Sequence, residues 1–286
     1  MSSEVRILRT PAELRAETRR WHAEGHRYAL VPTMGALHLG HLALVTEAFR
    51  HADIVAASIF INPRQFGKRE DLSRYPRKAA EDHAMLAKAG ATLVYAPSPE
   101  TMYPPGFATT VTLAGPAAAG LEDKFRPGFF PGVATVVSKL LAASAADFAM
   151  FGEKDYQQLK VVTQLARDLD LATEIIAVPT VREVDGLALS SRNAYLTSPQ
   201  RAAAPLLYRS LAEAAHAISK GETASQAIAG ARQKLRRAGF RVDYVACRNA
   251  ETLAPAKSPS EPMRILAAAW LGKTRLIDNV PVAPIQ

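Results

Sequence analysis

Two histidines, His38 and His41, stand three residues apart in the run VPTMGALHLGHLALV at residues 31–45. The run leads from an apolar segment into an amphipathic one, which predicts a strand followed by a helix that starts near His41. A helix N-terminus presents unpaired N–H groups to an anion, and imidazoles beside it can stabilise charge on phosphate oxygens. The alternative is that both histidines only cap the helix or pack in the core. Their position around Gly40, with Gly35 upstream to allow close backbone approach, favours phosphate binding.

Carboxamides follow the second apolar segment, in SIFINPRQFG at residues 58–67. Asn62 and Gln65 can orient hydroxyl groups and a carboxylate without adding charge. An Asn-Pro turn closed by its own side chain would explain Asn62 without a ligand. That alternative leaves Gln65 unexplained, so the stretch is a candidate binding site.

A third cluster, FGEKDYQQL at residues 151–159, joins a predicted strand to a helix through a tight turn. Lys154 can meet a phosphate, and Asp155 can accept from ribose hydroxyls or act near a metal. Asp155 and Gln158 lie three residues apart and so share a face of the predicted helix. On the residues alone, a charged first helical turn without a ligand is an equal alternative.

The fourth cluster is LALSSRN at residues 187–193. Ser190, Ser191 and Arg192 offer two hydroxyls and a permanent cation, which a mobile loop could use to hold a triphosphate. An ordinary linker is the alternative at this position.

Strands and helices alternate through the first part of the chain. Short apolar runs predict buried strands at residues 28–32, 53–61, 91–97, 146–151 and 173–181, and amphipathic patterns predict helices at 41–52, 77–90, 132–144 and 155–170. This alternation is typical of βαβ units in a doubly wound parallel sheet. Ligands of such sheets bind at the carboxyl ends of strands, near a switch in strand order.

The pattern changes after about residue 182. Two helices are predicted at 198–219 and 222–239, and three strands within 240–249 and 263–280. Ser198 and Pro199 open the first helix as N-cap and first helical residue. We therefore expect a Rossmann-like α/β domain over residues 1–182 and a smaller α+β domain over 183–286, which begins with the Ser-Ser-Arg-Asn loop.

Composition narrows the class of protein. The 286 residues are 48% hydrophobic, contain no apolar run of roughly eighteen residues and begin without the apolar region of a secretory signal. The single cysteine, Cys247, cannot form an intrachain disulfide, so we expect a cytoplasmic protein without membrane contact. The net charge of +8 is compatible with an enzyme whose basic surface is simply solvated, with a nucleic-acid binder, or with an enzyme that has anionic substrates. Because the basic residues are scattered and no RNA-binding motif occurs, we expect no nucleic-acid partner.

The four clusters, in this order and spacing, resemble the pantoate–β-alanine ligase (pantothenate synthetase) family. PTMGALHLGHLALV is similar to its His-x-Gly-His element, which the wider nucleotidyltransferase superfamily shares, and LGKTRLIDN matches near the C-terminus. The resemblance implies a nucleotidyltransferase-type fold whose C-terminal domain acts as a lid. It also implies ATP-dependent condensation of (R)-pantoate with β-alanine through pantoyl adenylate, giving pantothenate, AMP and pyrophosphate. Mg²⁺ carried by ATP and a homodimer are further implications.

The resemblance assigns roles to individual residues. The implied catalytic residues are His38, His41, Lys154, Ser190, Ser191 and Arg192, with His41 as proton donor to the departing phosphate. ATP would contact these six and also Met34, Gly35, Gly40, Gly152, Glu153, Asp155, Val181 and Leu189. Pantoate and β-alanine would contact Gln65, Gln158 and Asn62. No metal ligand is assigned.

One segment departs from the family pattern. The family shows Arg-Pro-Gly-His-Phe-x-Gly-Val, whereas this chain has RPGFFPGV, so Phe129 replaces the histidine and Pro131 fills the variable place. Arg126, Gly128 and Gly132 are kept. We expect the change to make the cover of the site more apolar and to leave the reaction class intact.

Two other functions are compatible with parts of the sequence. One is a different nucleotidyltransferase, which NPRQF and FGEKDYQQL argue against because the superfamily in general needs neither stretch. The other is a non-catalytic RNA- or tRNA-binding relative, which the basic charge favours. Nothing in the sequence resembles an anticodon-binding module.

Overall fold

The computed structural model describes residues 5–67, 70, 72–258 and 260–284 and divides into two compact units. Unit 1 comprises Met1–Leu113, Arg126–Glu153 and Val161–Pro179, and unit 2 comprises Ala114–Phe125, Lys154–Lys160 and Thr180–Gln286. Each predicted domain, 1–182 and 183–286, is one continuous stretch of sequence, whereas unit 2 also includes two short segments from earlier in the chain. The ends of those domains, residues 1–4 and 285–286, lie outside the described residues.

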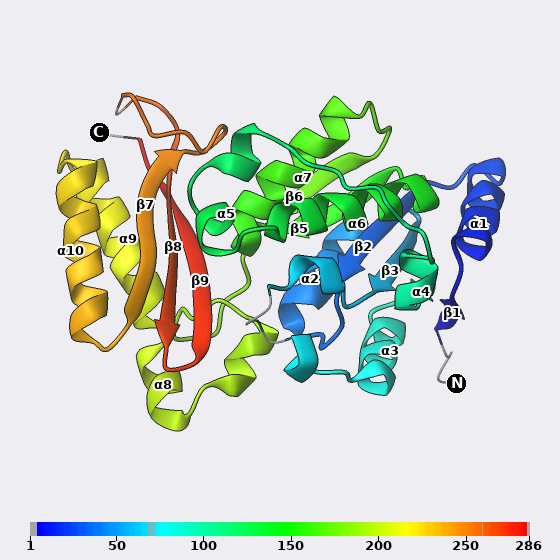
Figure 1. Cartoon of the computed structure of the whole chain (residues 1–286), viewed down its shortest axis with the longest axis horizontal. Coiled ribbons are helices and arrows are strands. Elements are labelled where there is room, and N and C mark those ends of the chain that lie inside the picture. The colour runs from blue at the N-terminus through cyan, green and yellow to red at the C-terminus, as the bar shows by residue number, and fades with distance from the viewer. Residues whose placement is uncertain (1–4, 68–69, 71, 259, 285–286) are drawn as a thin grey trace. The chain divides into compact units, whose positions relative to one another are not determined.

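Unit 1 is built on a six-stranded parallel sheet of order β1-β4-β3-β2-β5-β6 (Figure 1). Its strands are β1 (Arg6–Leu8), β2 (Tyr28–Thr33), β3 (Ile54–Ile59), β4 (Leu93–Tyr95), β5 (Phe148–Gly152) and β6 (Glu174–Val178). The register pairs Tyr28 with Ile54 and Thr33 with Ile59, so the carboxyl ends of β2 and β3 lie together. The predicted doubly wound sheet is confirmed, and β2 to β6 are the five predicted strands.

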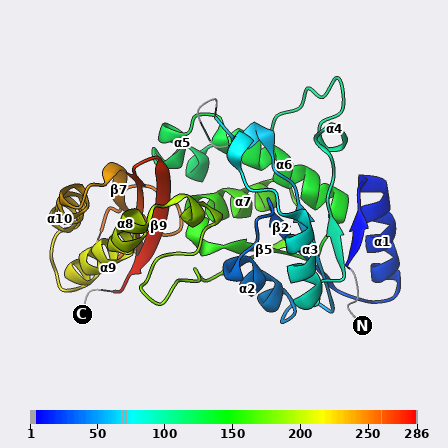
Figure 2. The ribbon, with the colours of Figure 1, turned by 90° about the horizontal axis from the view of Figure 1, so that it is seen from below.

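Helices cover both faces of this sheet. The helices of the first part of the chain are α1 (Pro11–Ala23), α2 (Leu39–Ala48), α3 (Ala79–Lys88), α4 (Pro99–Met102), α5 (Glu122–Phe125), α6 (Phe129–Ser144) and α7 (Tyr156–Asp168). Figure 2 shows α2 and α3 on one side of the sheet and α6 on the other. Side chains of β2 alternate accordingly: Val31 packs with Val45 of α2 and Leu86 of α3, and Tyr28 packs its ring 5.0 Å from that of Trp21 on α1. Within the described ranges, no helix has the length and apolar character needed to cross a membrane.

Strand β1 and helix α1 are not among the predicted elements. In β1, Arg6 is charged and both Arg6 and Ile7 are exposed, so the strand shows no apolar run, and it lies at the edge of the sheet beside β4. The start of α1 does carry a signal, because Thr10 and Glu13 form a capping box in which each side chain accepts the other's backbone N–H.

Two helix predictions need correction. The single helix predicted at 198–219 is two helices, α8 (Ser198–Ala203) and α9 (Leu206–Ser219), because Pro205 lacks an N–H and cannot continue α8. The N-cap is Thr197 rather than Ser198, and its N–H donates to the Gln200 side chain at 3.0 Å.

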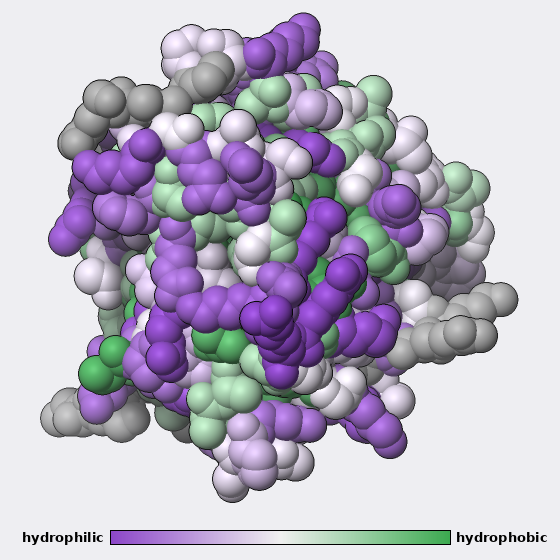
Figure 3. Space-filling model, turned by 90° about the vertical axis from the view of Figure 1, so that its left-hand side faces the viewer, coloured by the Kyte–Doolittle hydropathy of each residue, from purple (hydrophilic) through white to green (hydrophobic). Residues whose placement is uncertain are grey.

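Unit 2 contains the three predicted strands, β7 (Arg241–Asn249), β8 (Met263–Leu271) and β9 (Thr274–Val282), in an antiparallel sheet of that order. Helices α9 and α10 (Ala224–Arg237) pack against it around a core that includes Leu211, Leu235 and Ile265. Basic residues end α10, and hydrophilic residues predominate on the side shown in Figure 3, where hydrophobic ones are scattered.

Candidate functional site

Three of the four predicted clusters follow neighbouring strands of the unit 1 sheet. Residues 34–41 follow β2, residues 62–65 follow β3, and Gly152 ends β5 just before Glu153. Strand β2 lies between β3 and β5, so the chain runs outward from it in both directions. This is the switch in strand order at which doubly wound sheets bind their ligands.

A buried carboxylate holds the loop between β2 and α2. Gly35 and Ala36 both have positive φ, 80° and 51°, which turns their backbone sharply. Asp82 of α3 is 2% exposed and accepts the N–H groups of Ala36 and Leu37 at 2.9 and 2.8 Å. A Cβ on Gly35 would lie 2.9 Å from the Asp82 carboxylate, so glycine is required there. Sequence reasoning missed Asp82, since nothing in α3 indicates this partner.

The two histidines share the first turn of α2. His38 is the N-cap, and its Nδ1 accepts the N–H of Gly40 at 3.1 Å. The N–H of His38 donates to Nδ1 of His41 at 3.3 Å, and the ring centroids are 4.1 Å apart. Because each Nδ1 accepts a backbone N–H, each neutral ring carries its proton on Nε2. The contacts that cap the helix therefore also leave each imidazole with an N–H donor at Nε2.

Asn62 and Gln65 are in direct contact. Asn62 is 1% exposed and caps the 3₁₀ turn Pro63–Gln65, with Oδ1 accepting the N–H of Arg64 at 3.2 Å. Its Nδ2 donates to Oε1 of Gln65 at 2.9 Å. Gln65 is only partly buried, and its Nε2 lies 3.2 Å from Sδ of Met34. The Asx turn accounts for Asn62 without a ligand. The amide nitrogen of Gln65, in contrast, meets a thioether sulfur in this contact, and a thioether is a weak hydrogen-bond acceptor.

Tyr103 also belongs to this group, although sequence reasoning missed it. Its hydroxyl donates to Oδ1 of Asn62 at 2.8 Å, across 41 residues of sequence. Burial raises the pKa of Tyr103 to about 12, so the phenol keeps its proton at neutral pH. No sequence pattern links a tyrosine after the short helix α4 to the turn after β3.

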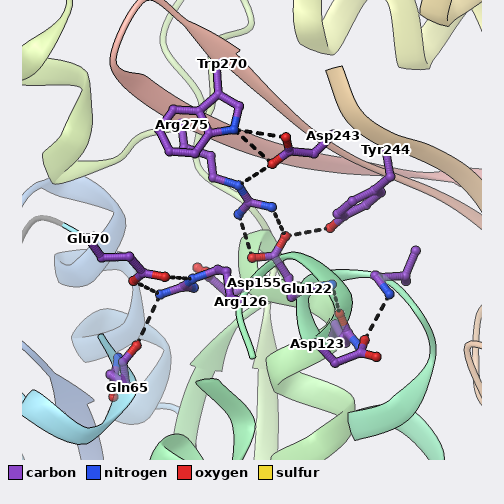
Figure 4. Close-up of polar contacts among 12 residues, drawn as sticks. Gln65, Glu70, Glu122, Asp123, Arg126, Asp155, Asp243, Tyr244, Trp270 and Arg275 are labelled. Carbon is purple, nitrogen blue, oxygen red and sulfur yellow. Dashed lines mark hydrogen bonds and ion pairs between the residues drawn. The ribbon is translucent and has the colours of Figure 1, made fainter. Parts of the chain in front are cut away.

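The segment that departs from the family pattern lies against the same turn. Arg126 forms a bidentate ion pair with Glu70 at 2.7 and 2.8 Å, and donates to the carbonyl of Gln65 at 3.3 Å (Figure 4). The guanidinium carbon is 3.7 Å from the centroid of the Phe129 ring. Phe129 therefore supports Arg126 by cation–π stacking, where an imidazole would offer a hydrogen-bond donor.

Helix α6 approaches the Gln65 turn at Gly132. A Cβ there would overlap the carbonyl oxygen of Arg64 and lie 2.8 Å from the nitrogen of Gln65. The Gly132 carbonyl accepts Nδ2 of Asn62 at 3.1 Å. Glycine is thus required for the contact that fixes this turn on α6.

The remaining predicted residues belong to unit 2. Lys154 and Asp155 lie in the 3₁₀ turn Glu153–Asp155, 3.6 Å apart between Nζ and Oδ2, and Asn279 donates to the Lys154 carbonyl at 3.0 Å. Asp155 precedes α7 instead of lying on it as predicted, while Gln158 is in the first turn of the helix and partly buried.

The Ser-Ser-Arg loop is an ordered turn. Ser190 caps the 3₁₀ turn Ser191–Tyr195, and its Oγ accepts the N–H of Arg192 at 3.3 Å. The N–H of Leu189 donates to the carbonyl of Val181 at 3.0 Å, so the structure brings these two predicted ATP contacts together.

A buried polar network holds the segment 114–125 within unit 2 (Figure 4). Glu122 is 6% exposed, pairs with Arg275 at 2.7 and 2.9 Å, and accepts from the hydroxyl of Tyr244 at 2.8 Å. Burial, with the Glu122 carboxylate beside it, raises the pKa of Tyr244 well above its usual value. Gln157 of α7 accepts the N–H of Glu122 at 2.8 Å. Segment 114–125 is therefore held both by α7 and by the sheet of unit 2.

No protein cage for a metal is present in the part of the chain that the structure describes, since no three His, Cys, Asp or Glu side chains there could hold an ion together.

Comparisons with known proteins point to one family. The family model described as Pantoate-beta-alanine ligase matches residues 6–281. The pantothenate synthetase of Paramagnetospirillum magneticum is 54% identical over 285 residues, 99% of this chain and 100% of that protein. The crystal structure of pantothenate synthetase from Thermus thermophilus is 47% identical with a TM-score of 0.92, over 98% of this chain and 100% of the other.

A third similar structure contains ligands. Pantoate-beta-alanine ligase from Francisella tularensis, complexed with beta-gamma ATP and beta-alanine, is 32% identical with a TM-score of 0.82 and covers 97% of both chains. These matches extend over nearly the full length and confirm the resemblance found in the four clusters. The chain therefore belongs to the pantoate–β-alanine ligase family and is an ATP-dependent ligase that joins pantoate to β-alanine.

Proposed function

We propose that the predicted site residues carry out this reaction in two half-reactions. A carboxylate oxygen of pantoate attacks the α-phosphorus of ATP, the bond to the bridging oxygen breaks, and pyrophosphate leaves pantoyl adenylate behind. The amine of β-alanine then attacks the acyl carbon, the bond to AMP breaks, and pantothenate is released. The observation that carries the proposal is the pair of imidazole N–H donors of His38 and His41 at the switch point of the sheet.

The first step needs alignment and charge neutralisation rather than a base. A carboxylate with an ordinary pKa of about 4 is already ionised at neutral pH. Repulsion between two anions opposes the attack, and fixed N–H donors reduce it. His38 and His41 donate hydrogen bonds from Nε2 to phosphate oxygens, and the His41 hydrogen bond stabilises the negative charge that develops on the departing phosphate.

The carboxamides align pantoate. Gln65 and Gln158 are partly buried and can donate to its oxygens without adding charge. Asn62 is almost completely buried, which favours a role in positioning Gln65 over direct substrate contact.

Further cations and hydroxyls are proposed to bind ATP. Lys154, Ser190, Ser191 and Arg192 neutralise and hold the phosphates, and Asp155 accepts from the ribose hydroxyls. The other proposed ATP contacts are Met34, Gly35, Gly40, Gly152, Glu153, Val181 and Leu189. The beta-gamma ATP and beta-alanine bound in the Francisella tularensis relative support both ligand classes.

Magnesium enters with ATP in this proposal. No protein ligand is assigned to it. Bound with ATP, it would neutralise part of the phosphate charge. From the family resemblance we further propose a homodimer, a cytoplasmic location, no nucleic-acid or membrane partner, and a lid role for residues 183–286.

Pantoate-dependent exchange of labelled pyrophosphate into ATP, with Mg²⁺ and without β-alanine, tests the first half-reaction. We expect exchange that requires pantoate. A folded protein that binds ATP and shows no exchange would contradict the proposal, and Phe129→His would then test whether the departure at that position is the cause.

A further inference from the structure

We infer that Tyr103 and Asn62 form a relay that fixes which end of the Gln65 carboxamide faces pantoate. The inference rests on the proposed role of Gln65. Tyr103 is a positioning residue in this relay, because it acts through Asn62.

Two backbone groups set the orientation of Asn62. The N–H of Arg64 can only donate, so the atom that it meets at 3.2 Å is the oxygen Oδ1. The carbonyl of Gly132 can only accept, so the atom 3.1 Å from it is the nitrogen Nδ2. With both ends assigned, the amide cannot be flipped.

The orientation of Gln65 follows from that of Asn62. The second hydrogen on Nδ2 of Asn62 points to Gln65 at 2.9 Å and needs an acceptor, so the Gln65 atom there is Oε1. The NH₂ group of Gln65 then points away from Asn62, toward the loop after β2, where it lies 3.2 Å from Sδ of Met34. Gln65 therefore presents a donor, which matches the carboxylate and hydroxyl oxygens of pantoate.

Tyr103 completes the hydrogen bonds of Asn62. Oδ1 accepts from the Arg64 N–H and from the Tyr103 hydroxyl at 2.8 Å, and both hydrogens on Nδ2 are used, so the four hydrogen-bonding positions of this buried side chain are filled. A side chain filled in this way has no position left for substrate and resists rotation.

Asn62→Asp reverses the relay with almost no change in shape. A carboxylate can still accept from Arg64 and Tyr103 but cannot donate to the Gly132 carbonyl or to Gln65. The Gln65 amide therefore turns its NH₂ group inward and its oxygen toward pantoate. We expect the half-saturating pantoate concentration in the exchange assay to rise roughly tenfold to a hundredfold, the effect of one mismatched buried hydrogen bond. The half-saturating ATP concentration should stay within about twofold, because neither Asn62 nor Gln65 is among the proposed ATP contacts.

Tyr103→Phe is the milder variant and remains informative if Asn62→Asp does not fold. Loss of one hydrogen bond to Oδ1 should raise the half-saturating pantoate concentration about threefold to tenfold. Tyr28→Phe is the matched control, since it removes a buried phenol hydroxyl at the opposite end of β2 and should leave pantoate saturation unchanged.

A double-mutant cycle decides whether Asn62 acts through Gln65. In a Gln65→Ala background, Asn62→Asp should change pantoate saturation by less than about threefold. The same factor in both backgrounds would mean that Asn62 contacts substrate itself, and it would overturn the relay. Normal pantoate saturation in Tyr103→Phe and Asn62→Asp would also overturn it, whereas a wild-type protein without exchange would instead contradict the proposed function.

Discussion

Replacing Asp82 by asparagine tests whether a buried carboxylate positions the loop that leads to the proposed catalytic histidines. Its two oxygens accept from Ala36 and Leu37 at 2.9 and 2.8 Å, in a site that is 2% exposed. Asparagine keeps one acceptor and turns an NH₂ group toward the other backbone N–H, donor against donor. The loss of one charge-assisted hydrogen bond, with an unpaired buried donor left behind, should lower the free energy of unfolding by about 2–4 kcal/mol.

The same change should slow catalysis. The loop has positive φ at Gly35 and Ala36 and leads directly into His38, so a shift of the loop moves both imidazole donors. A displacement of about 1 Å in a catalytic group typically lowers the rate by roughly 10²-fold. We therefore expect Asp82→Asn to lower the exchange rate constant by about that factor in protein that is still folded.

Urea denaturation and pyrophosphate exchange measure the two effects separately. Glu81→Gln, on the same helix with a side chain 65% exposed, is the control and should change stability by less than about 0.5 kcal/mol. Equal stability for Asp82→Asn and wild type would refute the energetic reasoning. A destabilised variant that exchanges at the full rate would refute the positioning role.

His41→Ala should lower the exchange rate constant by roughly 10²–10³ with little change in the urea midpoint, and full activity would exclude His41 as a required hydrogen-bond donor to the departing phosphate. Gly132→Ala places a Cβ against the carbonyl oxygen of Arg64 and should lower the free energy of unfolding by about 1–3 kcal/mol. Gly230→Ala, in α10 with open space around the added Cβ, should instead stabilise by about 0.5–1 kcal/mol in the same urea titration. Burial raises the pKa of Tyr103 from 10.0 to about 12, so its contribution to stability is present below pH 10 and is lost as the pH rises toward 12. Urea titrations across that range should show a shallower decline for Tyr103→Phe, and an unchanged decline would contradict the shift.

The predictable part of the fold is the part encoded in continuous stretches of sequence. Strands β2 to β5 are largely buried on both faces and therefore read as apolar runs. The edge strand β6 is more exposed but is also rich in apolar residues, whereas β1 exposes Arg6 and Ile7 and gives no such run. Pro205 indicates the break between α8 and α9, but the apolar pattern continues across it and therefore predicted a single helix.

Among the candidate site residues, too, those with a local sequence signal were predictable and those held by distant partners were not. His38 and Gln65 lie in loops whose local sequence is distinctive, so both could be named from the chain alone. Asp82 and Tyr103 act on residues 46 and 41 positions away, and their partners become visible only when the chain is folded. Hydrogen bonds between residues far apart in the chain leave no pattern in a single sequence.

The interleaved course of the chain through its two units limits how this protein can be divided. The chain passes from one unit to the other at residues 113/114, 125/126, 153/154, 160/161 and 179/180. A fragment that starts at Thr180 would contain all three strands of the smaller sheet but would lack Glu122, and removing one partner of a buried ion pair such as that with Arg275 destabilises by about 3–5 kcal/mol. Gene truncation, fusion or domain exchange at a single cut would therefore separate residues that fold together, so the smaller unit is not a transplantable module.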